Sequence, residues 1–146
     1  MSENEILILV VDDEAEDCER CATALHEEGY SVLQAADSTR ALRICEAQAR
    51  RIDLLVTDIS LPVTNGCELA QELLKRYPEL KVLFVSGYVG AEVCRYYGIP
   101  VTDLFFLRKP FQPAELVERA RRVLESNAPV PLKAEDGDSS TRHPSL

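Results

Sequence analysis

The sequence predicts a single α/β domain in which helices cover both faces of a parallel β-sheet. Five short apolar runs rich in branched residues recur along the chain, and a stretch with helical periodicity follows each of them. This alternation is typical of βαβ units, in which a helix joins two parallel strands. The predicted strands are residues 6–11, 32–35, 54–57, 82–85 and 104–107.

The apolar pattern also separates central strands from edge strands. Residues 6–11, 54–57 and 82–85 are apolar runs without a polar alternation. A strand that is buried on both faces has this kind of sequence, whereas a half-exposed strand alternates. We therefore expect these three strands at the centre of the sheet.

Several helix ends can be predicted from single residues. Asn65 is the expected N-cap of one helix, with Glu68 three residues later to complete a capping box. Pro113 suits the first turn of the last helix, where its missing N–H costs nothing. A short fourth helix is expected near residues 91–97, ended by Gly98.

Composition limits the functions that the chain can have. Its 146 residues are about one ordinary domain, and 46% apolar residues suffice for one continuous core. The net charge of -9 argues against sequence-independent binding to a nucleic-acid backbone, which needs a clustered positive surface. The longest apolar run, residues 6–11, is far shorter than the roughly 20 residues of a transmembrane helix.

The two ends of the chain indicate its location and a domain boundary. The N-terminus lacks the basic start and the long apolar stretch of a signal peptide, so a cytoplasmic protein is expected. The predicted domain covers residues 5–125. Over residues 126–146 the chain loses apolar periodicity and gathers Pro, Gly, Ser and Asp, which predicts a disordered tail.

Polar side chains follow four of the predicted strands, close to the points where those strands end. Asp12 and Asp13 follow the first strand, Asp58 the third, Ser86 the fourth and Lys109 the fifth. In an open parallel sheet, ligands bind beyond the carboxyl ends of the strands. We therefore expect acidic, hydroxyl and basic groups to converge on one edge of the sheet.

The predicted cluster of carboxylates favours a divalent cation. Carboxylates repel one another unless a cation or a lysine ammonium neutralises them. Mg2+ is suitable because it prefers oxygen ligands and commonly takes one or two carboxylates plus phosphate oxygens. A carboxylate can also attack phosphorus, and Lys109 would then supply positive charge while Ser86 donates its hydroxyl.

Three segments of the chain carry the most specific motifs. They are Asp58-Ile59-Ser60-Leu61-Pro62-Val63-Thr64-Asn65-Gly66, Val85-Ser86-Gly87-Tyr88 and Leu107-Arg108-Lys109-Pro110-Phe111. In this order they resemble the receiver family of two-component signalling, and the resemblance covers about residues 6–124. It implies a flavodoxin-like, doubly wound sheet of five parallel strands in the order 2-1-3-4-5, with five helices.

Carried over position by position, the resemblance makes Asp58 the phosphoryl acceptor and a ligand of Mg2+. Asp13 would ligate the metal directly, and Asp12 would do so through a metal-bound water. Ser60 would contribute its backbone carbonyl. The resemblance thus assigns all the expected protein ligands to the ends of the first and third strands.

Three further residues are implied to operate the switch. Lys109 would pair with Asp58 and then with its phosphoryl group, and the Lys109–Pro110 peptide bond would be cis. Ser86 would be the switching hydroxyl, and the ring of Phe106 would turn inward when Ser86 moves toward the phosphoryl group. Phe106 lacks the hydroxyl of the tyrosine that is more familiar at this position.

The implied function is a phosphorylation-dependent signalling switch that is not itself an enzyme, beyond assisting its own phosphorylation and dephosphorylation. The phosphoryl group would come from a sensor histidine kinase or a histidine phosphotransfer protein. The signal would then pass to an output partner that the sequence does not identify. No direct binding to nucleic acid or to a membrane is expected.

Three alternatives to this switch stay open. A haloacid-dehalogenase-type phosphatase also uses an aspartate nucleophile with Mg2+, but its second Asp stands where this chain has Ser60. A flavodoxin-like electron carrier needs a phosphate-binding loop after the first strand, where Asp12 and Asp13 would repel the phosphate. A receiver fold kept only as an unphosphorylated interaction module is disfavoured by the intact set of acids, hydroxyl and lysine.

Overall fold

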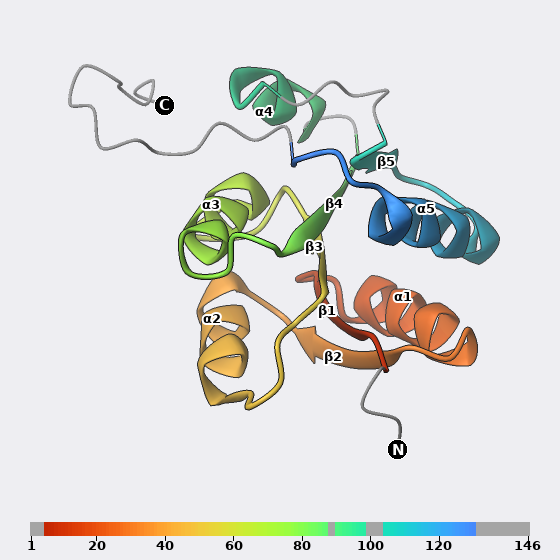
Figure 1. The fold of residues 1–146 in the computed structure, drawn as a ribbon. Coiled ribbons are helices and arrows are strands. Elements are labelled where there is room, and N and C mark those ends of the chain that lie inside the picture. Colours follow the sequence, from red (N-terminus) through yellow and green to blue (C-terminus); the bar gives the residue numbers. More distant parts are fainter. Residues whose placement is uncertain (1–4, 88–89, 99–103, 131–146) are drawn as a thin grey trace.

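The computed structural model describes residues 5–87, 90–98 and 104–130, in which strands and helices alternate (Figure 1). The strands are β1 (Leu7–Val11), β2 (Ser31–Ala35), β3 (Leu54–Asp58), β4 (Lys81–Ser86) and β5 (Phe106–Arg108). The helices are α1 (Ala15–Glu27), α2 (Ser38–Ala47), α3 (Gly66–Arg76), α4 (Gly90–Tyr96) and α5 (Pro113–Glu125). The predicted βαβ alternation is confirmed.

All five strands are parallel and form one sheet in the order β2-β1-β3-β4-β5. The chain moves from β1 outward to β2, returns to the other side of β1 as β3, and continues through β4 to β5. This confirms the doubly wound, flavodoxin-like fold. Because the direction of strand addition reverses between β1 and β3, a ligand-binding crevice is expected beyond their carboxyl ends.

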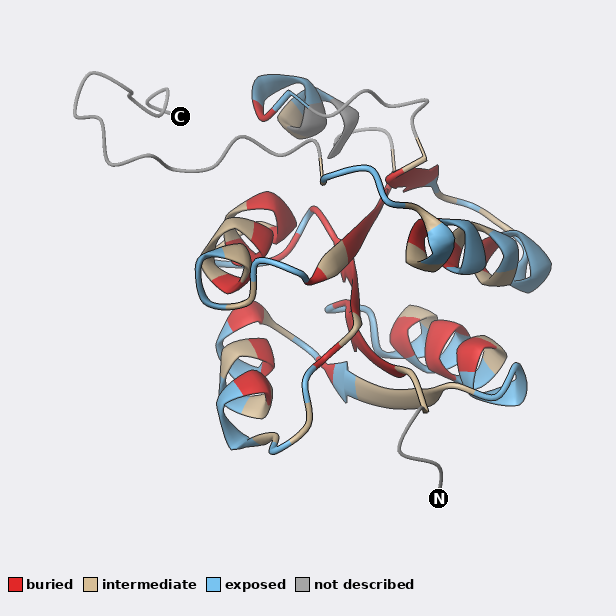
Figure 2. Cartoon of the chain, viewed as in Figure 1, coloured by how far each residue is buried: buried red, intermediate tan, exposed pale blue. Residues whose placement is uncertain are grey.

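Helices cover both faces of the sheet. The first and last helices, α1 and α5, lie on one face, and α2, α3 and α4 lie on the other (Figure 1). Two clusters of buried side chains fill these interfaces, one containing Cys21 and Leu116 and the other containing Cys45 and Leu73. Figure 2 shows the central strands as a buried layer between the helices.

The central strands are the three that the sequence predicts. Every residue of β1 and β3 is buried, and β4 is buried except for Lys81 at its start. Strand β2 lies at one edge and is mostly half-buried. Burial on both faces therefore explains the continuous apolar runs.

Strand bounds differ from the prediction by up to two residues. Strand β3 includes Asp58 and β4 includes Ser86, so both polar residues end buried strands. Strand β5 begins at Phe106, two residues later than predicted, and has only three residues. An apolar run does not by itself distinguish a strand from the buried turn that leads into it.

The predicted helix ends are also found. The side chain of Asn65 accepts a hydrogen bond from the backbone N–H of Glu68 (2.9 Å), and the Glu68 carboxylate accepts one from the Asn65 N–H (3.1 Å). This capping box opens α3. Pro113 is the first residue of α5, and Gly98 follows α4 with φ of 83°, in the left-handed region that favours glycine.

The first five residues of the predicted tail contact the domain. After α5 ends at Glu125, residues 126–130 run toward the side of the sheet that carries α3 and α4 (Figure 1). The Lys81 ammonium donates a hydrogen bond to the backbone carbonyl of Ser126, and Val130 packs against the core cluster on that side. Residues 131–146 lie outside the described part of the chain, so disorder there stays a prediction.

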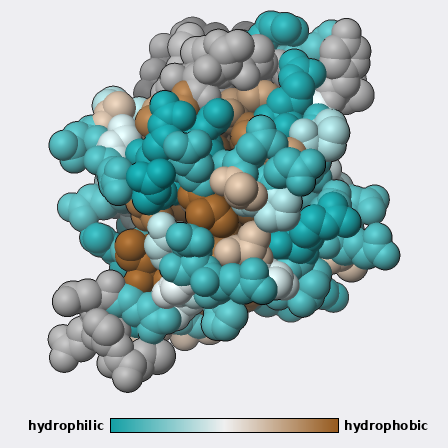
Figure 3. Space-filling view, turned by 90° about the vertical axis from the view of Figure 1, so that its right-hand side faces the viewer, coloured by the Kyte–Doolittle hydropathy of each residue, from teal (hydrophilic) through white to brown (hydrophobic). Residues whose placement is uncertain are grey.

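The surface on the side of α1 and α5 is mostly hydrophilic. On the face formed by α1 and α5, hydrophilic side chains dominate and surround a small apolar patch (Figure 3). Within residues 5–87, 90–98 and 104–130, no helix combines the length and the apolar character that crossing a membrane requires.

Candidate functional site at the carboxyl edge of the sheet

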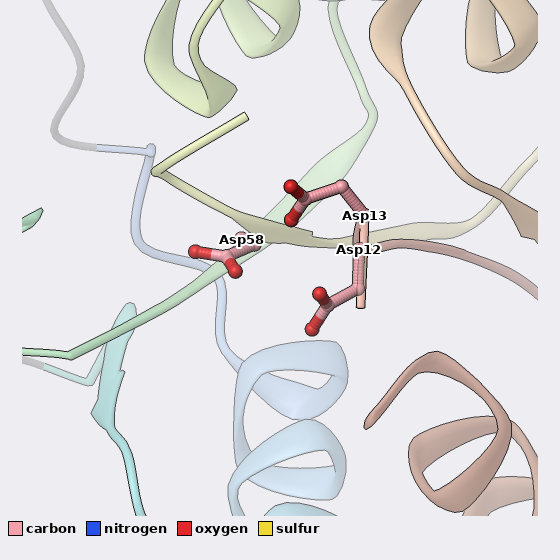
Figure 4. A group of neighbouring side chains, drawn as sticks. All are labelled: Asp12, Asp13 and Asp58. Carbon is pink, nitrogen blue, oxygen red and sulfur yellow. The ribbon is translucent and has the colours of Figure 1, made fainter. Parts of the chain in front are cut away.

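Three aspartates meet beyond the carboxyl ends of β1 and β3. Asp12 and Asp13 directly follow β1, Asp58 is the last residue of β3, and the two strands are paired neighbours. One carboxylate oxygen of each residue lies within 4.8 Å of the others, as Figure 4 illustrates. Asp12 and Asp58 are buried, whereas Asp13 is exposed. The predicted convergence of acids is therefore observed, and Asp13 lies on its solvent side.

Lys109 neutralises part of this negative charge. Its Nζ atom lies 2.9 Å from Asp12 Oδ2 and 3.1 Å from Asp58 Oδ2. Burial alone would lower the pKa of Lys109, but the hydrogen bond to Asp12 and the charge of Asp58 outweigh it and hold this pKa above its usual value. The ammonium therefore keeps its charge around neutral pH. The Lys109–Pro110 peptide bond is cis, as the resemblance implies.

Both carboxylate oxygens of Asp58 have hydrogen-bond donors. Oδ1 accepts a bond from the backbone N–H of Ser60 (3.0 Å), and Oδ2 accepts one from Lys109. Burial raises the pKa of Asp58, while the Lys109 charge and the Ser60 N–H partly offset this rise. Because the carboxylate is buried, little water surrounds it. Fewer water molecules must therefore be displaced before it can attack an electrophile.

The donor set suits a hard divalent cation. The three carboxylates face a single ammonium and keep an excess of negative charge, which a cation would balance. Carboxylate oxygens are the ligands that Mg2+ prefers, with water filling its remaining positions. Ser60 is exposed beside the cluster. Its backbone carbonyl remains a predicted ligand.

Ser86 lies at the end of β4, the strand next to β3. Its side chain is fully buried, and its Oγ has no hydrogen-bond partner among the residues that the structure describes. Its backbone carbonyl accepts a bond from the Lys109 N–H (2.9 Å), which ties the ends of β4 and β5 together. A buried hydroxyl without a partner is costly and is ready to bond to an incoming acceptor.

Phe106 is the first residue of β5 and is already inside the protein. Its side chain is 2% exposed and belongs to the core cluster on the side of α2 and α3. Our expectation that this ring turns inward on phosphorylation therefore stays a prediction.

Two residues near the site were not singled out from the sequence. The Asp17 carboxylate lies 3.4 Å from Lys109 Nζ, although the two residues are 92 positions apart. A Cβ atom on Gly66 would lie 2.2 Å from the backbone oxygen of Asp58. The motif contains Gly66 and could have pointed to a close approach, whereas no sequence pattern marks Asp17.

The fold and the site together define a doubly wound α/β domain with an acidic, lysine-paired site at its topological switch point. The chain belongs to the response regulator receiver domain family, whose model matches residues 8–121. This membership confirms the resemblance that the three motifs carry. It also favours a receiver over the phosphatase and electron-carrier alternatives.

Individual relatives agree with this family. The chain is 35% identical over 119 residues to the sensor kinase CckA of Brucella abortus and 37% identical over 125 residues to the phosphate regulon regulator PhoB of Pseudomonas aeruginosa. The matches cover 81% and 84% of this chain but only 12% and 53% of those proteins. The receiver domain of NtrX from Brucella abortus is similar in structure, with a TM-score of 0.68 and 34% identity over 82% of this chain and 98% of that one.

Proposed function

We propose that this receiver domain is a signalling switch that accepts a phosphoryl group on Asp58. The observation that carries the proposal is the position of the Asp58 carboxylate, which lies 3.1 Å from the Lys109 ammonium and within 4.8 Å of a carboxylate oxygen of Asp12 and of Asp13. A buried nucleophile flanked by a fixed cation and by potential metal ligands is the arrangement that phosphoryl transfer needs.

The proposed reaction forms an acyl phosphate. An oxygen of Asp58 bonds to phosphorus as the bond from phosphorus to the donor's histidine nitrogen breaks, and that electron pair leaves with the imidazole. Asp13, Asp58 and the Ser60 backbone carbonyl would hold Mg2+ directly, and Asp12 would do so through a water. The bound metal would supply positive charge for the phosphoryl oxygens. Lys109 would contribute a second, permanent positive charge.

Phosphorylation would then shift a conformational equilibrium. The phosphoryl group would add roughly two negative charges and several acceptors at Asp58, beside Lys109 and one strand away from Ser86, whose hydroxyl has no partner among the described residues. The conformer in which Ser86 and Lys109 both bond to it is thereby favoured. Because Lys109 and the Ser86 carbonyl are hydrogen-bonded, this movement would be transmitted to β5 and to Phe106.

The proposed partners are proteins. The donor would be a sensor histidine kinase or a histidine phosphotransfer protein, since receiver domains take phosphoryl groups from histidine kinases. The acidic net charge of -9 opposes direct binding to a nucleic-acid backbone, so the proposed output partner is a protein. The chemistry proposed for the domain itself is limited to its own phosphorylation and dephosphorylation.

The test is phosphorylation by a small donor. The protein is mixed with Mg2+ and acetyl phosphate, and its intact mass is measured beside that of Asp58→Asn. We expect one phosphoryl adduct on the wild type and none on the variant, because an amide lacks the nucleophilic oxygen charge. Equal labelling of the variant would reject Asp58 as the acceptor. An unlabelled wild type that still binds Mg2+ and resists a panel of histidine donors would favour the interaction module.

A further inference from the structure

Lys109 has a third carboxylate partner that the receiver motifs do not include. Its Nζ atom lies 3.4 Å from Asp17 Oδ2, beside the 2.9 Å and 3.1 Å contacts to Asp12 and Asp58. Asp17 stands in the first turn of α1, and its other oxygen lies 3.4 Å from an Arg20 nitrogen. An ammonium has three donors, so these three acids can occupy all of them.

The charges at the site single out Asp17. The proposed function assigns Asp12, Asp13 and Asp58 to Mg2+, and these acids are electrically balanced by the metal and by Lys109 together. Asp17 is a fourth acid beside these three, and its carboxylate is shared between Lys109 and Arg20. Of the three carboxylates that contact Lys109, Asp12 and Asp58 belong to the proposed metal site and Asp17 does not. The contact between Asp17 and the ammonium would therefore remain when the metal binds.

We infer that Asp17 is a positioning residue that restrains Lys109 and thereby slows the capture of a phosphoryl group at Asp58. This inference rests on the proposed function. Lys109 must loosen its contact with Asp17 when it turns to a phosphoryl oxygen, and the Asp17 charge itself repels the incoming group. Its side chain is 35% exposed, so solvent screens the interaction and the effect is moderate.

The surroundings of Asp17 leave room for Lys109 to move and give Asp17 a second cation. Asp17, Arg20 and Lys109 line one small cavity of about 130 Å³ between α1 and the segment that leads into α5. Arg20 offers Asp17 a second cation, so the carboxylate stays paired when Lys109 leaves. Lys109 can therefore move without leaving an unpaired acid behind.

The direct test is the affinity for beryllofluoride, a tetrahedral phosphoryl mimic that binds an aspartate oxygen, at saturating Mg2+. Asp17→Asn should bind beryllofluoride about 2- to 5-fold more tightly than the wild type, the range that a partly exposed ion pair supplies. The rate constant for phosphorylation by acetyl phosphate should rise by a similar factor. Asp17→Glu, which restores the charge, should return both values toward those of the wild type.

The matched control is Glu16→Gln, which removes the same charge from the same helical turn at an exposed side chain. Its affinity for beryllofluoride should stay at the wild-type value. The inference is overturned if Asp17→Asn binds no more tightly than the wild type, or if Glu16→Gln reproduces its gain. A wild type that neither binds beryllofluoride nor takes a phosphoryl group would instead refute the proposed function.

Discussion

The two neighbouring strand ends at the site differ in how completely their groups are bonded. At the end of β3, both Asp58 carboxylate oxygens have donors, and the following loop is closed by a bond from the Gly66 N–H to the Ile59 carbonyl (2.9 Å). At the end of β4, the Ser86 hydroxyl has no partner in the described structure, and a Cβ atom on Gly87 would meet no described atom within 4 Å.

Strand pairing becomes shorter at β5, whose end is hydrogen-bonded to Ser86. Within the described residues, β3 pairs with β1 over four residues and with β4 over five, whereas β5 pairs with β4 over three. Regions with few backbone bonds and few contacts open at a lower free-energy cost. The comparison supports a model in which the proposed acceptor, Asp58, is held in place while the proposed responding segments at Ser86 and β5 keep freedom to move.

The largest effect on stability is expected from Gly66→Ala, which crowds the end of β3. The new methyl group would lie 2.2 Å from the Asp58 carbonyl oxygen and 3.0 Å from Ile59 Cα, and backbone atoms cannot give way as side chains do. We expect a loss of unfolding free energy of about 3 kcal/mol, measured by urea denaturation, together with slower phosphorylation.

The matched control is Gly87→Ala, directly after the end of β4. Because a methyl group there would meet no described atom within 4 Å, the unfolding free energy of this variant should stay within about 0.5 kcal/mol of the wild type. If both substitutions were tolerated equally, the proposed contrast between a crowded and an open strand end would be lost.

Lys109→Ala tests the connection between the two sides. It leaves the buried carboxylates of Asp12 and Asp58 without their cation, so without Mg2+ we expect a loss of about 1 to 3 kcal/mol in unfolding free energy. Mg2+ should recover part of this loss. Some phosphorylation should remain in the intact mass, but the accompanying NMR shift changes at β5 should disappear. Unchanged shift responses in the variant would contradict the proposed role of Lys109.

Among the substitutions at proposed site residues, Ser86→Ala is expected to have the smallest effect on stability. The variant removes a buried hydroxyl that has no partner in the described structure, so its unfolding free energy should equal or exceed that of the wild type by up to about 1 kcal/mol. It should still be phosphorylated, with a weakened response at β5. Substantial destabilisation would mean that the hydroxyl is bonded in the resting protein.

Much of the fold could be predicted from the sequence because its signals are local. Apolar runs, helical periodicity and the capping box of Asn65 and Glu68 depend on residues that are close along the chain. The order of the strands came instead from the family resemblance, since periodicity does not specify which strands pair. The short β5 differs from the prediction, and the contacts of Ser126 and Val130 with the domain were not predicted, because packing decides both.

The same distinction holds for the site. The sequence by itself determined that Asp12, Asp13, Asp58, Ser86 and Lys109 follow strand ends, because each position is marked by the run before it. Only the tertiary structure decided that Asp17 reaches Lys109, that Gly66 lies against the Asp58 carbonyl, and that the Ser86 hydroxyl lacks a partner among the described residues. These three facts depend on how separate segments pack against one another, which no pattern of neighbouring residues specifies in atomic detail.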